Sequence, residues 1–325
     1  MSRALVARAP TRLDFGGGWT DVPPYTTEAG GAVCNVAITR YATATATIAG
    51  HAAARAGTAS AGDQVLVAAA LRRSGLPGAE ASLTSDFPVG SGLGGSSAAG
   101  VALAGALATL RGVSVEPGAL AQRSRATEVE ELGVAGGYQD HYAAAYGGAL
   151  LLTIEHGVDV ERIGLTPALC HALSERAVLV YTGESRISGR TISAVLDAYR
   201  AREPSVCAAL ARMKALAHEM AAALRAGDVD ALAALVAEHW THQRALHPSI
   251  TTPRIDALME TASRAGGIGG KALGASGGGC VVLFAAEGRA AELAAAVEPL
   301  GTRLPFEIDE RGFQVVAALS DEGIA

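Results

Sequence analysis

The part of this sequence richest in residues that could do chemistry is a glycine- and serine-rich segment at residues 88–100. Four glycines and three serines fall within eight positions, and a run of small apolar residues, 98–110, follows at once. Glycine permits backbone conformations and close approaches that a Cβ would block. A helix that begins after such a loop presents unpaired N–H groups and the positive end of its dipole. The segment therefore predicts a cradle for the phosphates of a nucleotide.

Two standard nucleotide loops are alternatives. Residues 90–95 match G-x-G-x-x-G, and Glu116 lies near the spacing found in dinucleotide-binding folds. However, the preceding segment, 81–88, alternates and then breaks at Pro88, whereas a buried parallel strand would be an almost continuous apolar run. A Walker loop needs Gly-Lys followed by Ser or Thr, which this chain lacks. The residues therefore favour a phosphate loop of a third kind.

Asp140 is the best single candidate for a catalytic carboxylate. It lies between two pairs of glycines in an otherwise apolar setting, which is a poor context for a solvated surface residue. His141 is the alternative, although a histidine in such a place is more often a structural hydrogen-bonding group. Glu128 belongs to a helix expected over 118–131. Carboxylates on such a helix usually face solvent, so Glu128 gains a function only if it faces the glycine loop.

Two further segments are rich in glycine. Three glycines, Trp19, Asp21 and paired prolines make residues 16–25 a loop of specific shape, in which Asp21 is either a turn residue or a ligand. The other segment, 266–280, is expected to be a loop that leads into a strand. The histidines near the end of the preceding helical region do not have the spacing of a metal site.

The composition limits the possible functions. A chain of 325 residues, half of them hydrophobic, should form one large domain or two. The net charge is −6 without a basic block, which argues against a nucleic-acid-binding surface. Four scattered cysteines indicate neither disulfides nor a metal site. With no signal peptide and no apolar run of about 20 residues, we expect a soluble, cytoplasmic protein without membrane contact.

The sequence also predicts the main elements. We expect strands at 4–15 (interrupted by Pro10), 31–38, 41–48, 81–85, 149–154, 177–181, 281–285 and 314–318. We expect helices at 64–72, 98–110, 118–131, 251–265 and 289–300, with further helices between about 190 and 246. A connection of mixed character, 158–173, marks the expected domain boundary.

Together, the three glycine-rich segments near residues 16, 90 and 275 resemble the motifs of the GHMP small-molecule kinases, in the same order and at similar intervals. Residues 88–98 correspond to the second motif and 274–280 to the third. Residues 8–25 and 30–38 are more closely similar to the sugar 1-kinase branch, which includes the D-glycero-D-manno-heptose 7-phosphate kinases and the L-fucokinases. The resemblance implies an α+β, two-domain GHMP kinase fold. Residues 1–165 would form a ribosomal protein S5 domain 2-like domain, and 166–325 a ferredoxin-like domain.

The resemblance also implies roles for individual residues, with ATP and Mg²⁺ as cofactors. Asp140 would act as base or orienting carboxylate on the acceptor hydroxyl, with Arg12 beside it. Glu128 and either Ser96 or Ser97 would hold Mg²⁺. The residues implied to bind the ATP phosphates are Gly90, Ser91, Gly92, Leu93, Gly94, Gly95, Ser96, Ser97 and Ala98. Those implied to bind the sugar are Gly17, Gly18, Trp19, Thr20, Asp21, Arg186 and Gly277.

Two departures from the family pattern concern the loops. An extra glycine before the paired serines leaves open which serine meets the metal. Ser276 replaces a glycine that is usual in the third motif and would slightly narrow that loop. Neither departure removes a charged group.

The implied reaction is phosphorylation of the anomeric C1 hydroxyl of a sugar phosphate. We favour D-glycero-D-manno-heptose 7-phosphate as acceptor over an unphosphorylated sugar such as fucose. A distal phosphate would need a cation, for which Arg186, Arg190, Lys271 and Arg40 are candidates. A non-catalytic sensor of sugar and ATP and a dinucleotide-dependent oxidoreductase are the other hypotheses. No partner beyond the small-molecule substrate is expected, and the protein would be a monomer or a homodimer.

Overall fold

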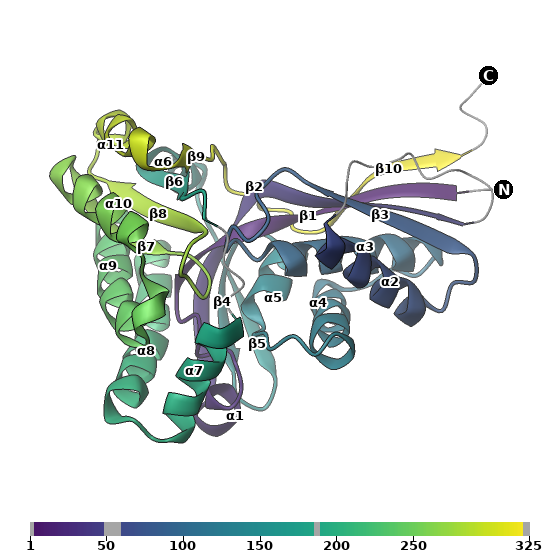
Figure 1. Ribbon diagram of the computed structural model, residues 1–325. Helices are drawn as coiled ribbons and strands as arrows, with labels where there is room; N and C mark the ends of the chain where they lie inside the picture. Colours follow the sequence, from purple (N-terminus) through teal and green to yellow (C-terminus); the bar gives the residue numbers. More distant parts are fainter. Residues whose placement is uncertain (1–2, 49–59, 185–188, 321–325) are drawn as a thin grey trace.

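The computed structural model describes residues 3–48, 60–184 and 189–320, which form two antiparallel sheets with helices packed on them (Figure 1). Within these residues, no helix is both long and apolar enough to cross a membrane.

The first sheet has six strands, ordered β10-β1-β2-β4-β5, with β3 paired to a second part of β2. Their bounds are β1 (Arg3–Gly16), β2 (Gly31–Ile48), β3 (Ala79–Ser85), β4 (Ala149–Ile154), β5 (Val158–Ile163) and β10 (Gln314–Ser320). The sequence places four of these strands, β1, β3, β4 and β10, correctly to within about two residues. β2 and β5 are the exceptions, and β5 lies inside the stretch predicted as an irregular connection. That stretch also holds most of α6 (Pro167–Arg176).

β2 corrects the prediction of two separate strands at 31–38 and 41–48. It is one strand that stays paired to β1 throughout, with a shift in register where Pro10 faces Tyr41 and Thr11 faces Ile38. Proline has no N–H to give to the ladder, so an irregularity at Pro10 is where a break in pairing costs least. Thr39 and Arg40 are the additional residues of the partner strand. The bulge thus bends β1 and β2 without ending them.

Four helices lie over one face of this sheet: α2 (Ala61–Ser74), α3 (Gly95–Leu110), α4 (Pro117–Ala126) and α5 (Gln139–Tyr146) (Figure 1). A π-helical turn, Thr127–Glu131, continues α4, and a short helix, α1 (Tyr25–Ala29), precedes β2. α3 is apolar on nearly all sides and almost wholly buried against β1 and β2. Its alanines and glycines allow this close approach. At Gly105, a Cβ would lie 2.2 Å from the ring of Phe313.

The second sheet has four antiparallel strands, ordered β7-β8-β6-β9. They are β7 (Gly267–Ala272), β8 (Cys280–Ala285), β6 (Ala177–Tyr181) and β9 (Thr302–Arg303). The other helices of this half are α7 (Gly189–Arg200), α8 (Pro204–Ala226), α9 (Val229–Ala245), α10 (Pro253–Arg264) and α11 (Ala290–Val297). β7 corrects the prediction of a loop at this position. Its pairing with β8 is not visible in a glycine-rich sequence that lacks alternation.

The two halves share one hydrophobic cluster. Leu13 and Phe15 of β1 are fully buried together with Met220 of α8 and Phe284 of β8. At Gly16, a Cβ would lie 2.4 Å from the Met220 sulfur. The face of the first sheet opposite α3 is therefore covered partly by α8.

The chain passes between the sheets twice. It leaves the first sheet after β5 and returns to it as β10, which pairs antiparallel with β1. The division of the chain at residues 165 and 166 remains a prediction. β10, at the end of the second predicted unit, lies in the sheet of the first.

Candidate active site

The glycine-rich loop leads directly into α3. The helix begins at Gly95, three residues earlier than predicted, so Ser96 and Ser97 lie in its first turn. Gly94, the N-cap residue, has a left-handed conformation with φ of 75°, and the first helical hydrogen bond runs from the Ala98 N–H to the Gly94 carbonyl. The N–H groups of residues 95–97 lie before that bond and are the ones that a helix leaves without an internal partner. Such a helix end can bind an anion; the phosphate cradle itself stays a prediction.

Arg12 and Asp140 meet beside this loop. The Arg12 Nε donates to Asp140 Oδ1 over 2.8 Å, and Nη1 donates to the Gly92 carbonyl over 2.7 Å. The Arg12 side chain is 3% exposed and that of Asp140 27%, so the carboxylate is the reachable member of the pair. Burial opposes the charge of Arg12, but Asp140 and Asp14 more than offset it and raise its pKa. The expected proximity of Arg12 to Asp140 is thus confirmed.

The missing side chain at Gly94 makes room for the Asp140 carboxylate. A Cβ on Gly94 would lie 2.8 Å from the Asp140 Cγ. Asp140 lies in the first turn of α5, a helix that the sequence did not predict because glycines flank it on both sides. The N-termini of α3 and α5 therefore meet at this carboxylate.

Glu128 is buried rather than solvated and faces the glycine loop, as its functional role would require. Its carboxylate accepts from the Ser96 hydroxyl over 2.6 Å and from the Ser97 hydroxyl over 3.1 Å. His141 lies 3.0 Å from the same carboxylate, and its other nitrogen lies 3.0 Å from the Ser124 hydroxyl. His141 is 2% exposed, which supports a structural role for it over a catalytic one.

The Glu128 site suits a hard cation. Burial would raise the pKa of Glu128, but His141 and the two serines outweigh burial and lower it, so the carboxylate stays ionised. A carboxylate and a hydroxyl beside a helix N-terminus provide the few oxygen ligands that Mg²⁺ takes from proteins. Ser96 is exposed, whereas Ser97 is 5% exposed and also contacts His141. Among the described residues, no cluster of three or more His, Cys, Asp or Glu side chains could hold a metal by itself.

The loop at residues 16–21 is held tightly by backbone and buried side chains. The Gly17 N–H donates to His239 Nε2 over 3.0 Å, and burial lowers the pKa of His239, in keeping with a neutral ring. The Thr20 hydroxyl donates to the Gly17 carbonyl over 2.7 Å. Trp19 adopts a φ of 81°, unusual for a residue with a side chain, and its indole belongs to the buried cluster that holds Tyr25 and Trp240.

Asp21 connects this loop to the helix that carries Asp140. Its Oδ2 accepts from the Tyr138 N–H over 2.8 Å and the Gln139 N–H over 3.1 Å. A Cβ on Gly137 would lie 1.9 Å from this oxygen, so the glycine is required for the approach. Burial is the main cause that raises the pKa of Asp21 to about 6. Asp21 therefore helps to fix the position of α5, in addition to any contact that it makes with a ligand.

The third glycine-rich segment packs against the second. The Cys280 N–H donates to the Ser91 carbonyl over 2.7 Å, and a Cβ on Gly92 would lie 2.7 Å from the Leu273 carbonyl oxygen. Ser276 adopts a φ of 68° and its hydroxyl accepts from Gln243. The Gly277 N–H donates to the Ile250 carbonyl over 2.8 Å. This segment thus packs against the backbone of the second glycine-rich segment and stabilises its conformation.

The predicted cations for a distal phosphate differ in their surroundings. Lys271 is wrong for this role, because it is 0% exposed and its ammonium group bonds to Asp14. Arg40 donates to the backbone carbonyls of Asp86 and Pro305. Arg186, and the side chain of Arg190, lie outside the residues that the structure describes.

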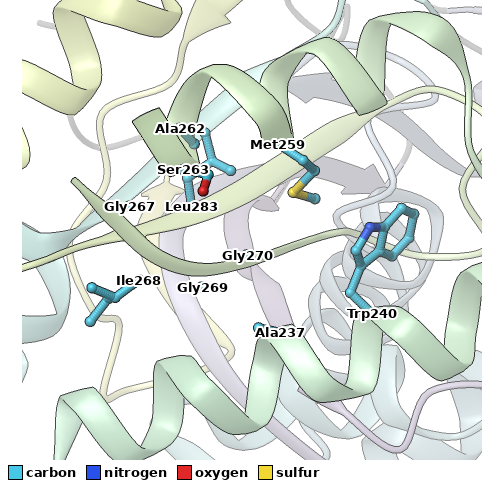
Figure 2. A pocket seen from close by; sticks show the side chains of 10 residues that line it. All are labelled: Ala237, Trp240, Met259, Ala262, Ser263, Gly267, Ile268, Gly269, Gly270 and Leu283. Carbon is cyan, nitrogen blue, oxygen red and sulfur yellow. The ribbon is translucent and has the colours of Figure 1, made fainter. Parts of the chain in front are cut away.

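A cavity of about 260 Å³ lies elsewhere, between α9, α10 and β7 (Figure 2). Its lining is mainly apolar and includes Trp240, Met259, Ile268 and Leu283. It contains none of the predicted site residues. The catalytic candidates gather instead around the N-termini of α3 and α5.

Comparison with known proteins agrees with this arrangement. The model for the GHMP kinases N-terminal domain matches residues 61–148, and the model for the GHMP kinases C-terminal domain matches residues 220–299. The first range holds the phosphate loop, Glu128 and Asp140. The second holds α9, β7 and the third glycine-rich segment.

Curated relatives include sugar kinases. The chain is 26% identical to a bifunctional fucokinase/GDP-fucose pyrophosphorylase from Arabidopsis thaliana, over 89% of the chain and 30% of that protein. It is 26% identical to an L-fucokinase/L-fucose-1-P guanylyltransferase from Bacteroides fragilis, over 95% of the chain and 38% of that protein. It is 29% identical to a D-glycero-alpha-D-manno-heptose 7-phosphate kinase from Campylobacter jejuni, over 62% of the chain and 59% of that protein. The chain thus spans about a third of the length of the two bifunctional relatives.

Solved structures share the fold. A structure described as a D-glycero-D-manno-heptose 1-phosphate kinase from Bacteroides thetaiotaomicron matches with a TM-score of 0.75 and 24% identity, over 98% of this chain and all of that one. The Lactococcus lactis galactokinase complexed with galactose matches with a TM-score of 0.71 and 17% identity, over 96% and 95% of the two chains. With both domain models matched in order and the same fold in these kinases, the chain belongs to the GHMP kinase family.

Proposed function

We propose that this protein is an ATP- and Mg²⁺-dependent kinase that phosphorylates the C1 hydroxyl of a sugar, with D-glycero-D-manno-heptose 7-phosphate as the preferred acceptor. The observation that carries the proposal is the Arg12–Asp140 pair, 2.8 Å apart, next to the helix end at Gly94. A cation, a reachable carboxylate and a phosphate-binding helix terminus are the groups that phosphoryl transfer requires.

Each group at the site would have a separate role in phosphoryl transfer. When bound, ATP supplies the phosphoryl group and Mg²⁺ neutralises charge on it. The N–H groups at the start of α3 would bind the phosphates, and Glu128 with Ser96 would hold the metal. Arg12 is fixed by Asp140 and Gly92, so its guanidinium is already oriented toward the loop. Such preorganisation lowers the barrier without a covalent step.

Asp140 would take or orient the proton of the acceptor hydroxyl. Its carboxylate is partly exposed, and only one of its oxygens is bonded to Arg12 in the described part of the chain. The second oxygen is therefore available to a hydroxyl. The acceptor would lie against residues 17–21, whose loop is anchored to the same helix through Asp21.

Arg125 is a candidate for binding a distal phosphate. Its guanidinium lies 3.8 Å from the centre of the Tyr138 ring, and Nε donates to the Gly137 carbonyl over 3.2 Å. Within the described residues it forms no ion pair with a carboxylate. It lies next to the start of α5, so it could reach an anion on the acceptor. An Arg125→Met variant should raise KM for a sugar phosphate and leave KM for the matching free sugar unchanged.

A panel of acceptors tests the proposed function. The purified protein would be incubated with ATP, Mg²⁺ and, in turn, heptose 7-phosphate, fucose, galactose and mannose, with ADP measured by a coupled assay. We expect turnover of heptose 7-phosphate, with the product phosphorylated at C1 by ³¹P NMR. Turnover of fucose alone would replace our acceptor by the fucokinase alternative. No turnover of any sugar, with MgATP binding intact, would favour the sensor hypothesis.

The assigned base has its own test. Asp140→Asn should lower kcat by about 1,000-fold, as expected for the loss of a general base, and leave MgATP binding intact. Asp159→Asn, an exposed carboxylate on β5, is the matched control and should change nothing. An Asp140→Asn protein with normal turnover would remove Asp140 from the mechanism.

A further inference from the structure

Lys271 is buried in a place where its charge needs a partner. The chain contains two lysines, and this one is 0% exposed on β7 of the second sheet. Its Nζ donates to Asp14 Oδ2 over 2.7 Å and to the Asp14 backbone carbonyl over 3.0 Å. The pair therefore connects the second sheet to β1 of the first, two residues from Arg12.

Asp14 depends on this lysine. Its other oxygen, Oδ1, is buried and has no hydrogen-bond partner among the described residues. Burial works against the charge, yet Lys271 and then Arg12 hold the pKa of Asp14 below its usual range. Lys271 is thus the main group that keeps this buried carboxylate ionised.

Arg12 lies between two carboxylates. Arg12 and Asp14 are two residues apart on β1, so their side chains point to the same face of the sheet. Asp140 also lies on this face. Arg12 is bonded to Asp140, whereas Asp14 is bonded to Lys271. A buried carboxylate that loses its partner is strongly destabilised, and the nearest remaining cation would be Arg12. The two ion pairs therefore exclude a different pairing, Arg12 with Asp14.

We propose that Lys271 is a positioning residue: by neutralising Asp14, it leaves Arg12 free to pair with Asp140 at the transfer site. This proposal rests on the proposed kinase function. It gives the third glycine-rich segment, which carries Lys271 on its strand, a direct influence on the phosphate site of the first half.

Substitutions at both members of the buried pair test the proposal. Lys271→Met should lower kcat by about 100-fold, because a shift of the reacting groups by about 1 Å has an effect of this size, with KM for ATP unchanged. Adding Asp14→Asn removes the competing charge. The double variant should recover kcat to within about tenfold of the parent protein. A purely structural role predicts instead that the variants differ in stability alone and keep the kcat of the parent protein per folded molecule.

The measurements must separate activity from folding. Thermal unfolding followed by circular dichroism gives the folded fraction, and kcat is expressed per folded molecule. Lys214→Met, at the other lysine, is the matched control, because Lys214 donates to the Ala29 carbonyl on the surface. If Lys271→Met does not fold, the double variant is compared with the parent protein, and its kcat should lie within about tenfold of the parent value; a loss of 100-fold or more in the folded double variant would overturn the proposal.

Two results would overturn the proposal: a folded Lys271→Met protein with normal kcat, or a double variant as inactive as Lys271→Met. Absence of kinase activity in the parent protein would instead contradict the proposed function. The two failures are therefore distinguishable.

Discussion

The second and third glycine-rich segments have similar compositions and opposite uses. In residues 90–97, the N-cap is a glycine without a side chain to cap the helix N–H groups, and the exposed Ser96 lies beside them. In residues 266–279, glycines bring backbones into contact. A Cβ on Gly269 would lie 2.1 Å from the Ala233 carbonyl oxygen of α9. The second segment leaves a helix end free for the phosphate binding that we propose, whereas the third packs backbone against backbone.

The difference lies in what surrounds each glycine. Gly94 faces a partly exposed carboxylate, so a side chain there would disturb chemistry. Gly269 faces a buried helix backbone, so a side chain there would disturb packing. Composition alone does not distinguish the two, because glycine serves both purposes through the same missing atom.

Gly94→Ala should have the largest effect on kcat. A small effect would contradict the contrast drawn between the two glycine-rich segments. The added Cβ would push Asp140 from its place, so we expect a loss of about 1,000-fold in kcat, similar to loss of the base itself. Gly75→Ala is the control. Gly75 also has a left-handed φ, of 64°, but a Cβ added there would meet nothing within 4 Å. Equal kcat in the two variants would contradict the role assigned to Gly94.

Gly269→Ala should act on stability. Forcing α9 away from β7 should lower the free energy of unfolding by about 3 kcal/mol. Urea denaturation measures this change. Gly164→Ala, at a position with open space and an ordinary φ, is the matched control and should have little effect. A stable Gly269→Ala protein would show that the third segment does not need its glycines for packing.

Asp21 offers a test that depends on pH. Its pKa is raised from 3.8 to about 6, so the stability that the protonated form contributes is present below pH 3.8 and lost as pH rises through about 6. Asparagine can accept the same two N–H bonds without a charge. Asp21→Asn should therefore stabilise the protein at pH 8, by up to about 3 kcal/mol, and the gain should vanish at acid pH, below the ordinary pKa of an aspartate. Melting temperatures across this range measure it; a gain independent of pH would contradict the assignment.

The two serines should separate in a smaller effect. Ser96→Ala should raise the Mg²⁺ concentration needed for half-maximal activity by about tenfold. Ser97→Ala should leave this requirement unchanged and lower stability by about 1 kcal/mol, because Ser97 bonds within the buried group around His141. Titration with Mg²⁺ distinguishes the two, and the reverse result would assign the metal to Ser97.

The sequence predicts the continuously apolar strands, such as β4 and β8, and the residues that gather at the glycine-rich loop. It fails where structure depends on distant partners. β7 forms because β8 and α9 lie beside it, and its own residues carry no strand pattern. α5 is too short and too closely bounded by glycine to stand out. β2 reads as two strands because Thr39 and Arg40, at the bulge, interrupt its apolar pattern.

Lys271 shows the same limit within the site. The sequence suggests a phosphate ligand there because a distal phosphate would need a cation. One signal does point to a different role: a chain with many arginines uses lysine only twice. The burial of Glu128 likewise depends on His141 and Ser97, which only folding brings beside it.

The return of β10 to the edge of β1 has a consequence for synthesis of the chain. The first sheet contains β1 and a segment that is made much later, residues 314–320. Pairing across so many residues is slow to form because of its loop-closure entropy. As the chain emerges, α3 and the phosphate loop can assemble on β1 and β2, while the outer edge of β1 stays uncovered until the second half is complete. This edge is the part of the nascent protein most in need of protection from aggregation.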